Sequence, residues 1–179
     1  IETIGPKVGD ELKTSALQAI LIALGLVLIY ITFRFQWRQG IAAIITLLHD
    51  VMVVVGIFSI FDKEFTLPVI AALLTVVGYS LNDTIVIFDR IRENISKFRK
   101  RELLPLINQS VTETLSRTLL TSGTTLMVVL ALVFLGGEII HDFAFALLVG
   151  VLIGTYSSIY VASPTVLWLT KIAPPKTSD

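Results

Sequence analysis

The chain has 179 residues, of which 54% are hydrophobic and 16% are charged, and its mean hydropathy is +0.84. Because an ordinary soluble domain carries roughly 25% charged residues, this composition excludes that class and favours a polytopic membrane protein. The formal net charge is zero, so bulk charge indicates no nucleic-acid partner, and the absence of cysteine excludes disulfides, thiolate metal sites and cysteine nucleophiles.

Five apolar runs follow one another along the chain. Each is close to or above the ~20 residues that cross ~30 Å of hydrocarbon as a helix. Helices satisfy their backbone hydrogen bonds internally, whereas open strands do not, so the runs are expected to be helical. The predicted fold is all-α, a polytopic membrane bundle of five transmembrane helices. The runs cover residues 15–33, 41–61, 65–88, 119–135 and 143–169.

The polar segments divide the chain further. Residues 1–14, with a loop at 5–10, are expected to form an extracytoplasmic lead-in, 15–170 the transmembrane domain and 171–179 a cytoplasmic tail. The long loop 89–116 is amphipathic: we expect a helix that continues the third run, a turn near Pro105 and a second short helix. Its basic residues either set topology and touch anionic membrane lipid, or form a docking surface for a cytoplasmic partner.

Lysine and arginine positions predict the orientation. Besides Arg117, the segments after the first, third and fifth runs hold ten of the 14 lysines and arginines, whereas the two alternate loops hold only Lys63. By the positive-inside rule the N-terminus lies outside and the C-terminus lies in the cytoplasm. Five spans that start outside lead us to expect that an upstream span precedes this sequence.

Two charged residues stand out at the membrane-spanning segments. Asp83 lies within the third run, and Arg117 lies two residues before the fourth run, where the next span is expected to begin. An ionised carboxylate in hydrocarbon costs about 2.5–3.5 kcal/mol on insertion scales, so such a residue is a functional hypothesis by default. A hairpin of adjacent helices would bring the two side chains to similar depth. They are predicted to form a proton or ion relay, or else a static buried ion pair.

Hydroxyl and amide side chains surround these charges. They either bond back to their own helices and support packing, or line a path for water. We expect Ser80, Asn82, Thr84 and Thr121 to support the relay, within a larger set that includes Ser116, Thr118, Ser122, Thr124 and Thr125.

The second run carries His49 and Asp50 near its middle. An acid beside an imidazole suits a proton relay, and the alternative is a hydrogen bond that pins neighbouring helices. In the fifth run, Gly150, Gly154 and Ser158 have the small-xxx-small spacing of close helix packing, and Gly78 and Gly123 are expected to serve the same end.

Common catalytic motifs are absent. The sequence contains no H-E-x-x-H, no G-x-S-x-G turn and no P-loop. The chain is therefore predicted not to be an enzyme, and no metal or organic cofactor is expected.

With these residues in hand, the chain resembles the SecF family of bacterial protein-export membrane proteins. Two long motifs carry the resemblance: G-Y-S-L-N-D-T-I-V-I-F-D-R-I-R-E-N at 78–94 and S-R-T-L-L-T-S-G-T-T at 116–125. Two shorter ones support it: L-H-D-V at 48–51 and I-G-T-Y-S-S-I-Y-V-A-S-P at 153–164. The chain is equally similar to the C-terminal end of a fused SecDF polypeptide.

The resemblance implies a six-span half related to the resistance-nodulation-division superfamily, here without its first span and the soluble domain after it. It implies that Asp83 and Arg117 couple proton-motive force, carried by H⁺ or Na⁺, to protein export in the bacterial inner membrane. The implied partners are SecD, the SecYEG channel, the exported preprotein and YajC. The alternative is a scaffold subunit that stabilises SecD and the channel without conducting protons.

Overall fold

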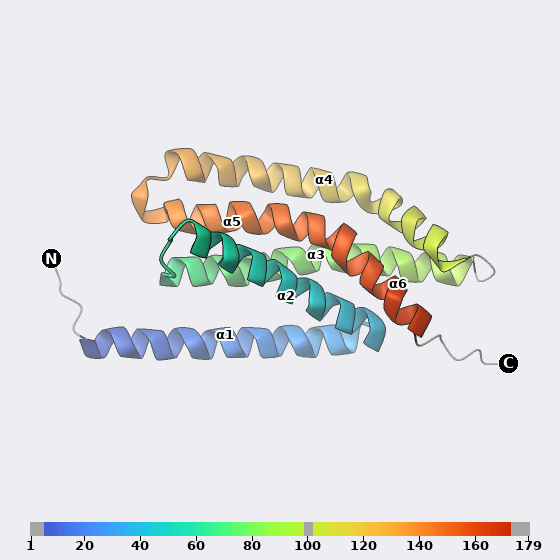
Figure 1. Ribbon diagram of the computed structural model, residues 1–179, viewed down its shortest axis with the longest axis horizontal. Coiled ribbons are helices and arrows are strands. Elements are labelled where there is room, and N and C mark those ends of the chain that lie inside the picture. Colours follow the sequence, from blue (N-terminus) through green and yellow to red (C-terminus); the bar gives the residue numbers. More distant parts are fainter. Residues whose placement is uncertain (1–5, 99–101, 173–179) are drawn as a thin grey trace. The chain divides into compact units, whose positions relative to one another are not determined.

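The computed structural model describes residues 6–98 and 102–172, which are helical almost throughout and contain no strand. The helices are α1 (Pro6–Arg34), α2 (Trp37–Ile60), α3 (Leu67–Lys97), α4 (Leu103–Leu135), α5 (Glu138–Ser157) and α6 (Ser163–Ile172), with a π-helical turn, η1 (Ser158–Ala162), between the last two (Figure 1). The all-α prediction is confirmed. The chain forms two units, residues 1–36 and 37–179, so α1 is described by itself.

Four helical segments are long and apolar enough to cross a membrane: α2, α3, α4 and the continuous stretch Glu138–Ile172. The predicted span at 15–33 falls in α1, where the apolar stretch found is the shorter Leu21–Arg34. The membrane-bundle class therefore agrees with the prediction, but the count of five spans does not follow from the described residues.

Two details of the polar segments differ from the sequence-based expectation. Pro6–Asp10, expected in a loop, lie in the first turns of α1. The expected turn near Pro105 is wrong, because Pro105 lies in the first turn of α4, which begins at Leu103 and runs without a break to Leu135. Proline is tolerated in a first turn, where its missing N–H has no helical partner to lose. Residues 1–5, 99–101 and 173–179 of the predicted lead-in, loop and tail lie outside the described residues.

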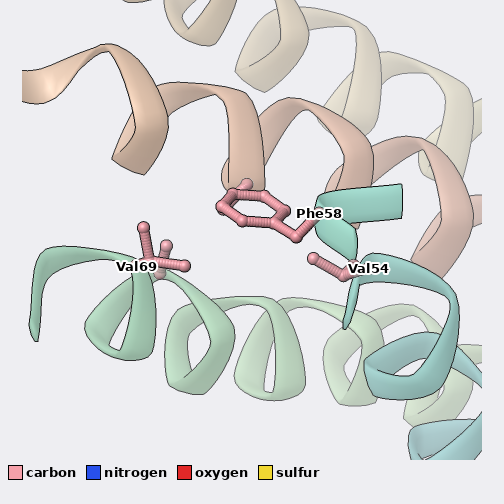
Figure 2. Packing of buried hydrophobic residues seen from close by; sticks show 5 residues of the cluster. Val54, Phe58 and Val69 are labelled. Atoms are coloured by element: carbon pink, nitrogen blue, oxygen red, sulfur yellow. The ribbon is translucent and has the colours of Figure 1, made fainter. Parts of the chain in front are cut away.

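Helix α5 lies at the centre of the second unit and packs against α2, α3 and α4 (Figure 1). One apolar cluster joins three of these helices: Val54 and Phe58 of α2, Val69 and Ala72 of α3, and Ala146 of α5, all fully buried (Figure 2). The Phe58 ring lies 5.7 Å from the ring of Phe145. Just beyond the cluster, Lys63 pairs with Asp142 at 2.5 Å and closes this end of the bundle.

Small residues allow α5 to approach α3. A methyl group at Gly150 would overlap the side chain of Val76, and one at Gly154 would lie 3.1 Å from the Cβ of Ser80. A side chain at either position would crowd α3, so these two glycines permit the close approach of α5 to α3. The expectation for Gly78 and Gly123 is wrong within this chain, because no described atom lies within 4 Å of a Cβ built at either position.

The π-helical turn has a local cause. Pro164 has no N–H, and its ring would clash with the carbonyl four residues earlier in a regular α-helix. Five residues, Ser158–Ala162, form a wider turn immediately before it. The Ser163 hydroxyl donates to the Ser158 carbonyl at 3.3 Å, across this turn. The chain bends where α5 passes into α6 (Figure 1), as π-bulges and prolines commonly cause.

Candidate functional site

Asp83 lies on α3 and is 3% exposed. Its only hydrogen bond among the described residues is a long one, from the Ser122 hydroxyl of α4 to Oδ2 at 3.4 Å. The Ser122 oxygen lies 2.7 Å from that of Thr155 on α5. Hydroxyls from α4 and α5 are thus linked to this carboxylate, yet most of its acceptor capacity is unused by the described residues.

Arg117 lies at the corresponding level of the antiparallel neighbour. Asp83 is 14 residues before the end of α3 at Lys97, and Arg117 is 14 residues after the start of α4 at Leu103, which is about 21 Å in each case. The charge of Arg117 acts on Asp83, but the two side chains form no ion pair in the part of the chain that the structure describes. Arg117 is exposed, so the predicted static pair is not the arrangement found here.

A cavity of about 330 Å³ extends from Arg117 towards the ends of α3 and α4. Most of its wall belongs to residues 89–97 and 103–116, which we call the polar hairpin because charged and amide side chains fill it. The cavity is lined by Val86, Asp89, Arg90, Glu93, Glu113, Thr114 and Arg117.

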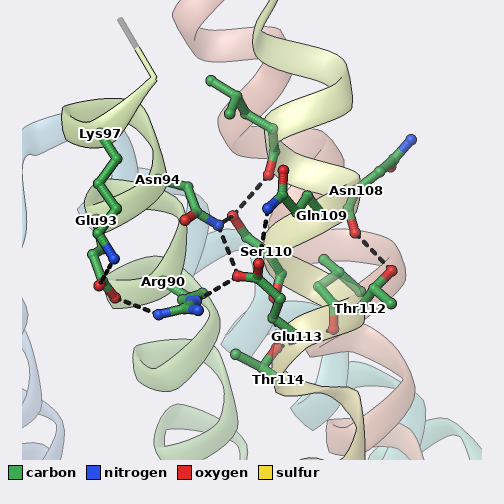
Figure 3. A network of polar contacts seen from close by, with 12 residues as sticks. Arg90, Glu93, Asn94, Lys97, Asn108, Gln109, Ser110, Thr112, Glu113 and Thr114 are labelled. Atoms are coloured by element: carbon green, nitrogen blue, oxygen red, sulfur yellow. Dashed lines mark hydrogen bonds and ion pairs between the residues drawn. The ribbon is translucent and has the colours of Figure 1, made fainter. Parts of the chain in front are cut away.

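Hydrogen bonds hold the polar hairpin together (Figure 3). Arg90 of α3 donates to Glu113 of α4 at 2.5 Å and to Glu93 at 2.6 Å. Asn94 is buried and donates to Ser110 at 2.9 Å and to Glu113 at 3.0 Å. The carboxylate of Glu113 therefore bridges the two helices one turn before Arg117.

Asp50 forms a second polar site within the bundle. It lies on α2 and is 0% exposed. Its Oδ2 accepts hydrogen bonds from Ser80 of α3 at 2.5 Å and from Ser157 of α5 at 2.9 Å. Its Oδ1 lies 3.0 Å from Nδ1 of His49, whose side chain is 33% exposed. We call Asp50, His49, Ser80 and Ser157 the Asp50 cluster.

The other predicted supporting residues form no hydrogen bond with either acid among the described residues. The Thr84 hydroxyl is buried and lies 3.1 Å from that of Ser158, which also donates to the Gly154 carbonyl at 2.8 Å. Thr121 instead donates to the Arg117 and Thr118 carbonyls of its own helix. Asn82 is exposed on α3, so its side chain does not point into the bundle as that of Asp83 does.

Sequence reasoning did not single out Ser157 and Thr155. The available signal was their place in the polar stretch 155–158 of an otherwise apolar run. One further hydroxyl is notable: Thr118 is 1% exposed, and its Oγ1 has no hydrogen-bond partner among the described residues. Thr118 lies one turn before Ser122 on α4, so its unpaired hydroxyl is on the same face of α4 as the hydroxyl that donates to Asp83.

Comparison with known proteins assigns the chain to a family. The family model described as "Protein export membrane protein SecD/SecF, C-terminal" matches residues 1–172. The protein translocase subunit SecF of Desulfurispirillum indicum is 58% identical over 166 residues, which cover 91% of this chain and 53% of the relative. SecF of Vibrio alginolyticus is 56% identical over 169 residues, covering 94% and 54%.

A fused relative and a solved structure agree. The protein translocase subunit SecDF of Thermus thermophilus is 53% identical over 166 residues, covering 93% of this chain and 23% of the relative. A crystal structure of SecDF in a super-membrane-facing form superposes with a TM-score of 0.83 at 49% identity, covering 94% of this chain and 23% of that one. The chain thus spans about half the length of the SecF relatives. It belongs to the SecD/SecF family of protein-export membrane proteins and corresponds to the family's C-terminal part.

Proposed function

We propose that this chain is the transmembrane part of an auxiliary subunit of the Sec preprotein translocase, and that it couples proton-motive force to protein export. Its partners are SecD, the SecYEG channel and the exported preprotein. Asp83 binds and releases the proton, and Arg117 responds to its charge. Homology to SecF and SecDF supports the export role. The arrangement around Asp83 supports the coupling.

The observation that carries the proposal is the mismatch between the burial of Asp83 and its few bonds. The side chain is 3% exposed and accepts one hydrogen bond of 3.4 Å. Buried polar groups are normally satisfied, because leaving one unpaired costs about 1–3 kcal/mol. An acid kept in this way inside a membrane bundle is suited to changing its protonation state.

Arg117 supplies a way to convert that change into motion. When Asp83 carries its charge it attracts the guanidinium, and when it binds a proton the attraction is lost. Arg117 also lines the cavity that leads to the polar hairpin, so a guanidinium released from Asp83 has acidic side chains and solvent to turn to. Two states with different proton affinity are the minimum that coupling requires.

The proposal is tested with Asp83→Asn in the full-length protein, together with SecD in membrane vesicles. Asparagine keeps the size of the side chain but cannot carry the proton, so the proton-dependent stage of export should be lost while the complex still assembles. Asn82→Ala, at the exposed neighbouring position, is the matched control and should retain export. Full proton dependence in Asp83→Asn would exclude the relay.

A scaffold role is the second candidate, and the strongly bonded Asp50 cluster favours it because it ties three helices together. The combined exchange Asp83→Arg with Arg117→Asp separates the two. A scaffold that needs only opposite charges should stay active, whereas a proton carrier moved to α4 should fail. Comparing export driven by a proton gradient with export driven by a sodium gradient identifies the coupling ion.

A further inference from the structure

We infer that Asp50 is a positioning residue for Asp83, an acceptor that fixes α3 and α5 one turn away from the proton-binding carboxylate. This inference deepens the proposed function and rests on it. Asp50 lies on a different helix from Asp83, is fully buried and contacts two serines that belong to the same helices as the surroundings of Asp83.

Hydrogen bonds hold the Asp50 carboxylate in one position. Both of its oxygens have partners: Oδ2 accepts from Ser80 at 2.5 Å and Ser157 at 2.9 Å, and Oδ1 contacts His49 at 3.0 Å. The shorter contact has the length typical of a hydroxyl bound to a carboxylate. A buried carboxylate with this many partners is well satisfied, so it has little reason to exchange them during a proton cycle.

The connection to Asp83 runs through two helices. On α3, Ser80 lies three residues before Asp83, which places both on one face of the helix. On α5, Ser157 lies two residues after Thr155, whose hydroxyl contacts the Ser122 hydroxyl that donates to Asp83. Ser80 is held from a second side as well, because the backbone of α5 at Gly154 comes close to its Cβ. Asp50 therefore sets the positions of two elements that surround the proton-binding site.

Among the described residues, His49 is the titratable side chain that contacts Asp50. Asp83 lies three residues after Ser80 on α3, and Arg117 lies at the level of Asp83 on α4. The contact from α5 is the uncharged hydroxyl of Ser157. A change in proton-driven export caused at Asp50 must therefore pass through its hydroxyl contacts, His49, or the field it exerts on Asp83.

The first experiment compares Asp50→Asn with Asp50→Leu in the full-length protein with SecD, measuring proton-driven export per assembled complex across a range of pH. Asparagine keeps one oxygen that accepts from the serines, whereas leucine keeps none. A positioning role predicts that Asp50→Asn retains export within about tenfold, the worth of one weakened hydrogen bond, and that Asp50→Leu loses more. The pH of half-maximal export should also move in Asp50→Asn.

Thr46→Ala is the matched control, because Thr46 is a buried residue one turn earlier on α2 whose one hydroxyl hydrogen bond among the described residues goes to the Ala42 carbonyl of its own helix. It should leave both the rate and the pH profile unchanged. If Asp50→Asn abolishes proton-driven export as completely as Asp83→Asn, Asp50 carries the proton itself and the inference is wrong. It is equally wrong if Asp50→Leu exports like the unmodified protein.

A second readout does not depend on export and so separates this inference from the proposed function. Hydrogen–deuterium exchange of the purified full-length protein reports local opening of α3. In Asp50→Leu, and in the double variant Ser80→Ala with Ser157→Ala, the peptide spanning residues 80–87 should exchange at least about tenfold faster, as expected for the loss of a buried hydrogen bond. Unchanged exchange there would overturn the inference even if Asp83 proves essential.

Discussion

Asp50 and Asp83 are two acids buried at neighbouring levels of one helix bundle, and their surroundings differ in kind. Asp50 accepts short hydrogen bonds from two helices and contacts a histidine, whereas Asp83 accepts one bond of 3.4 Å. Burial alone would rank Asp50, at 0% exposed, as the more unusual residue. The number of hydrogen bonds that a buried carboxylate accepts, rather than how deeply it is buried, therefore separates an acid that holds helices together from one that is suited to exchanging a proton.

The largest expected effect tests that difference through stability. Asp50→Leu leaves the Ser80 hydroxyl without its acceptor and leaves the Ser157 hydroxyl with only its bond of 3.2 Å to the Gly154 carbonyl. An unpaired buried donor costs about 1–3 kcal/mol and a lost hydrogen bond about 1 kcal/mol, so the free energy of unfolding should fall by about 2–4 kcal/mol. Asp83→Leu removes one long hydrogen bond and should cost less than about 1 kcal/mol. Unfolding in mixed detergent micelles measures both. An equal loss in the two variants would remove the contrast between the acids.

A second prediction concerns the spacing of α3 and α5, which both sites share. Gly150→Ala places a methyl group against Val76, and overpacking of this kind costs about 1–3 kcal/mol. Gly78→Ala is the control, because no described atom lies near a Cβ there. It should change the free energy of unfolding by less than about 0.5 kcal/mol. The same unfolding assay applies, and a costly Gly78→Ala would show that α3 has a neighbour at this face.

The third and smallest effect contrasts both buried acids with one outside the apolar spans. Hydrogen bonds from Asn94 and Gln109, followed by that from Arg90, lower the pKa of Glu113 from 4.5 to about 2. A depressed pKa means that the stability from this group is present above pH 4.5 and is lost as the pH falls towards 2. Glu113→Gln should therefore flatten the dependence of unfolding on pH in that window. Parallel pH curves for the two proteins would show that Glu113 does not contribute.

Much of the fold follows from the order of apolar runs, because a membrane helix must satisfy its own backbone. The cost of a charge in hydrocarbon likewise singles out Asp83 from the amino-acid sequence alone. The extents of α3 and α4 are harder to predict, since the polar hairpin is helical through contacts such as Arg90 with Glu113, 23 residues apart. No local pattern encodes a pairing of that kind.

The Asp50 cluster shows the same limit inside the bundle. Its serines lie 30 and 107 residues away from Asp50 along the chain. The sequence leaves a relay and a helix pin both open for Asp50, because the difference depends on which hydroxyls reach it. Which hydroxyls reach Asp50 depends in turn on how α5 approaches α3. Gly150 and Gly154 permit a close contact there, but their spacing does not specify which helix packs against them.

The wide turn of η1 affects which face of the helix carries a four-residue repeat of small residues. Residues spaced by four advance about 40° beyond a full circle at 3.6 residues per turn, so a strict four-residue repeat drifts off one face of a regular helix. Gly150, Gly154, Ser158, Ala162 and Val166 follow this repeat and are all buried. Local underwinding at η1 absorbs part of the drift and keeps the stripe facing inward. If Ser158–Ala162 instead formed a regular α-helical turn of the same length, the drift would return and the end of the stripe would rotate away from the interior of the bundle.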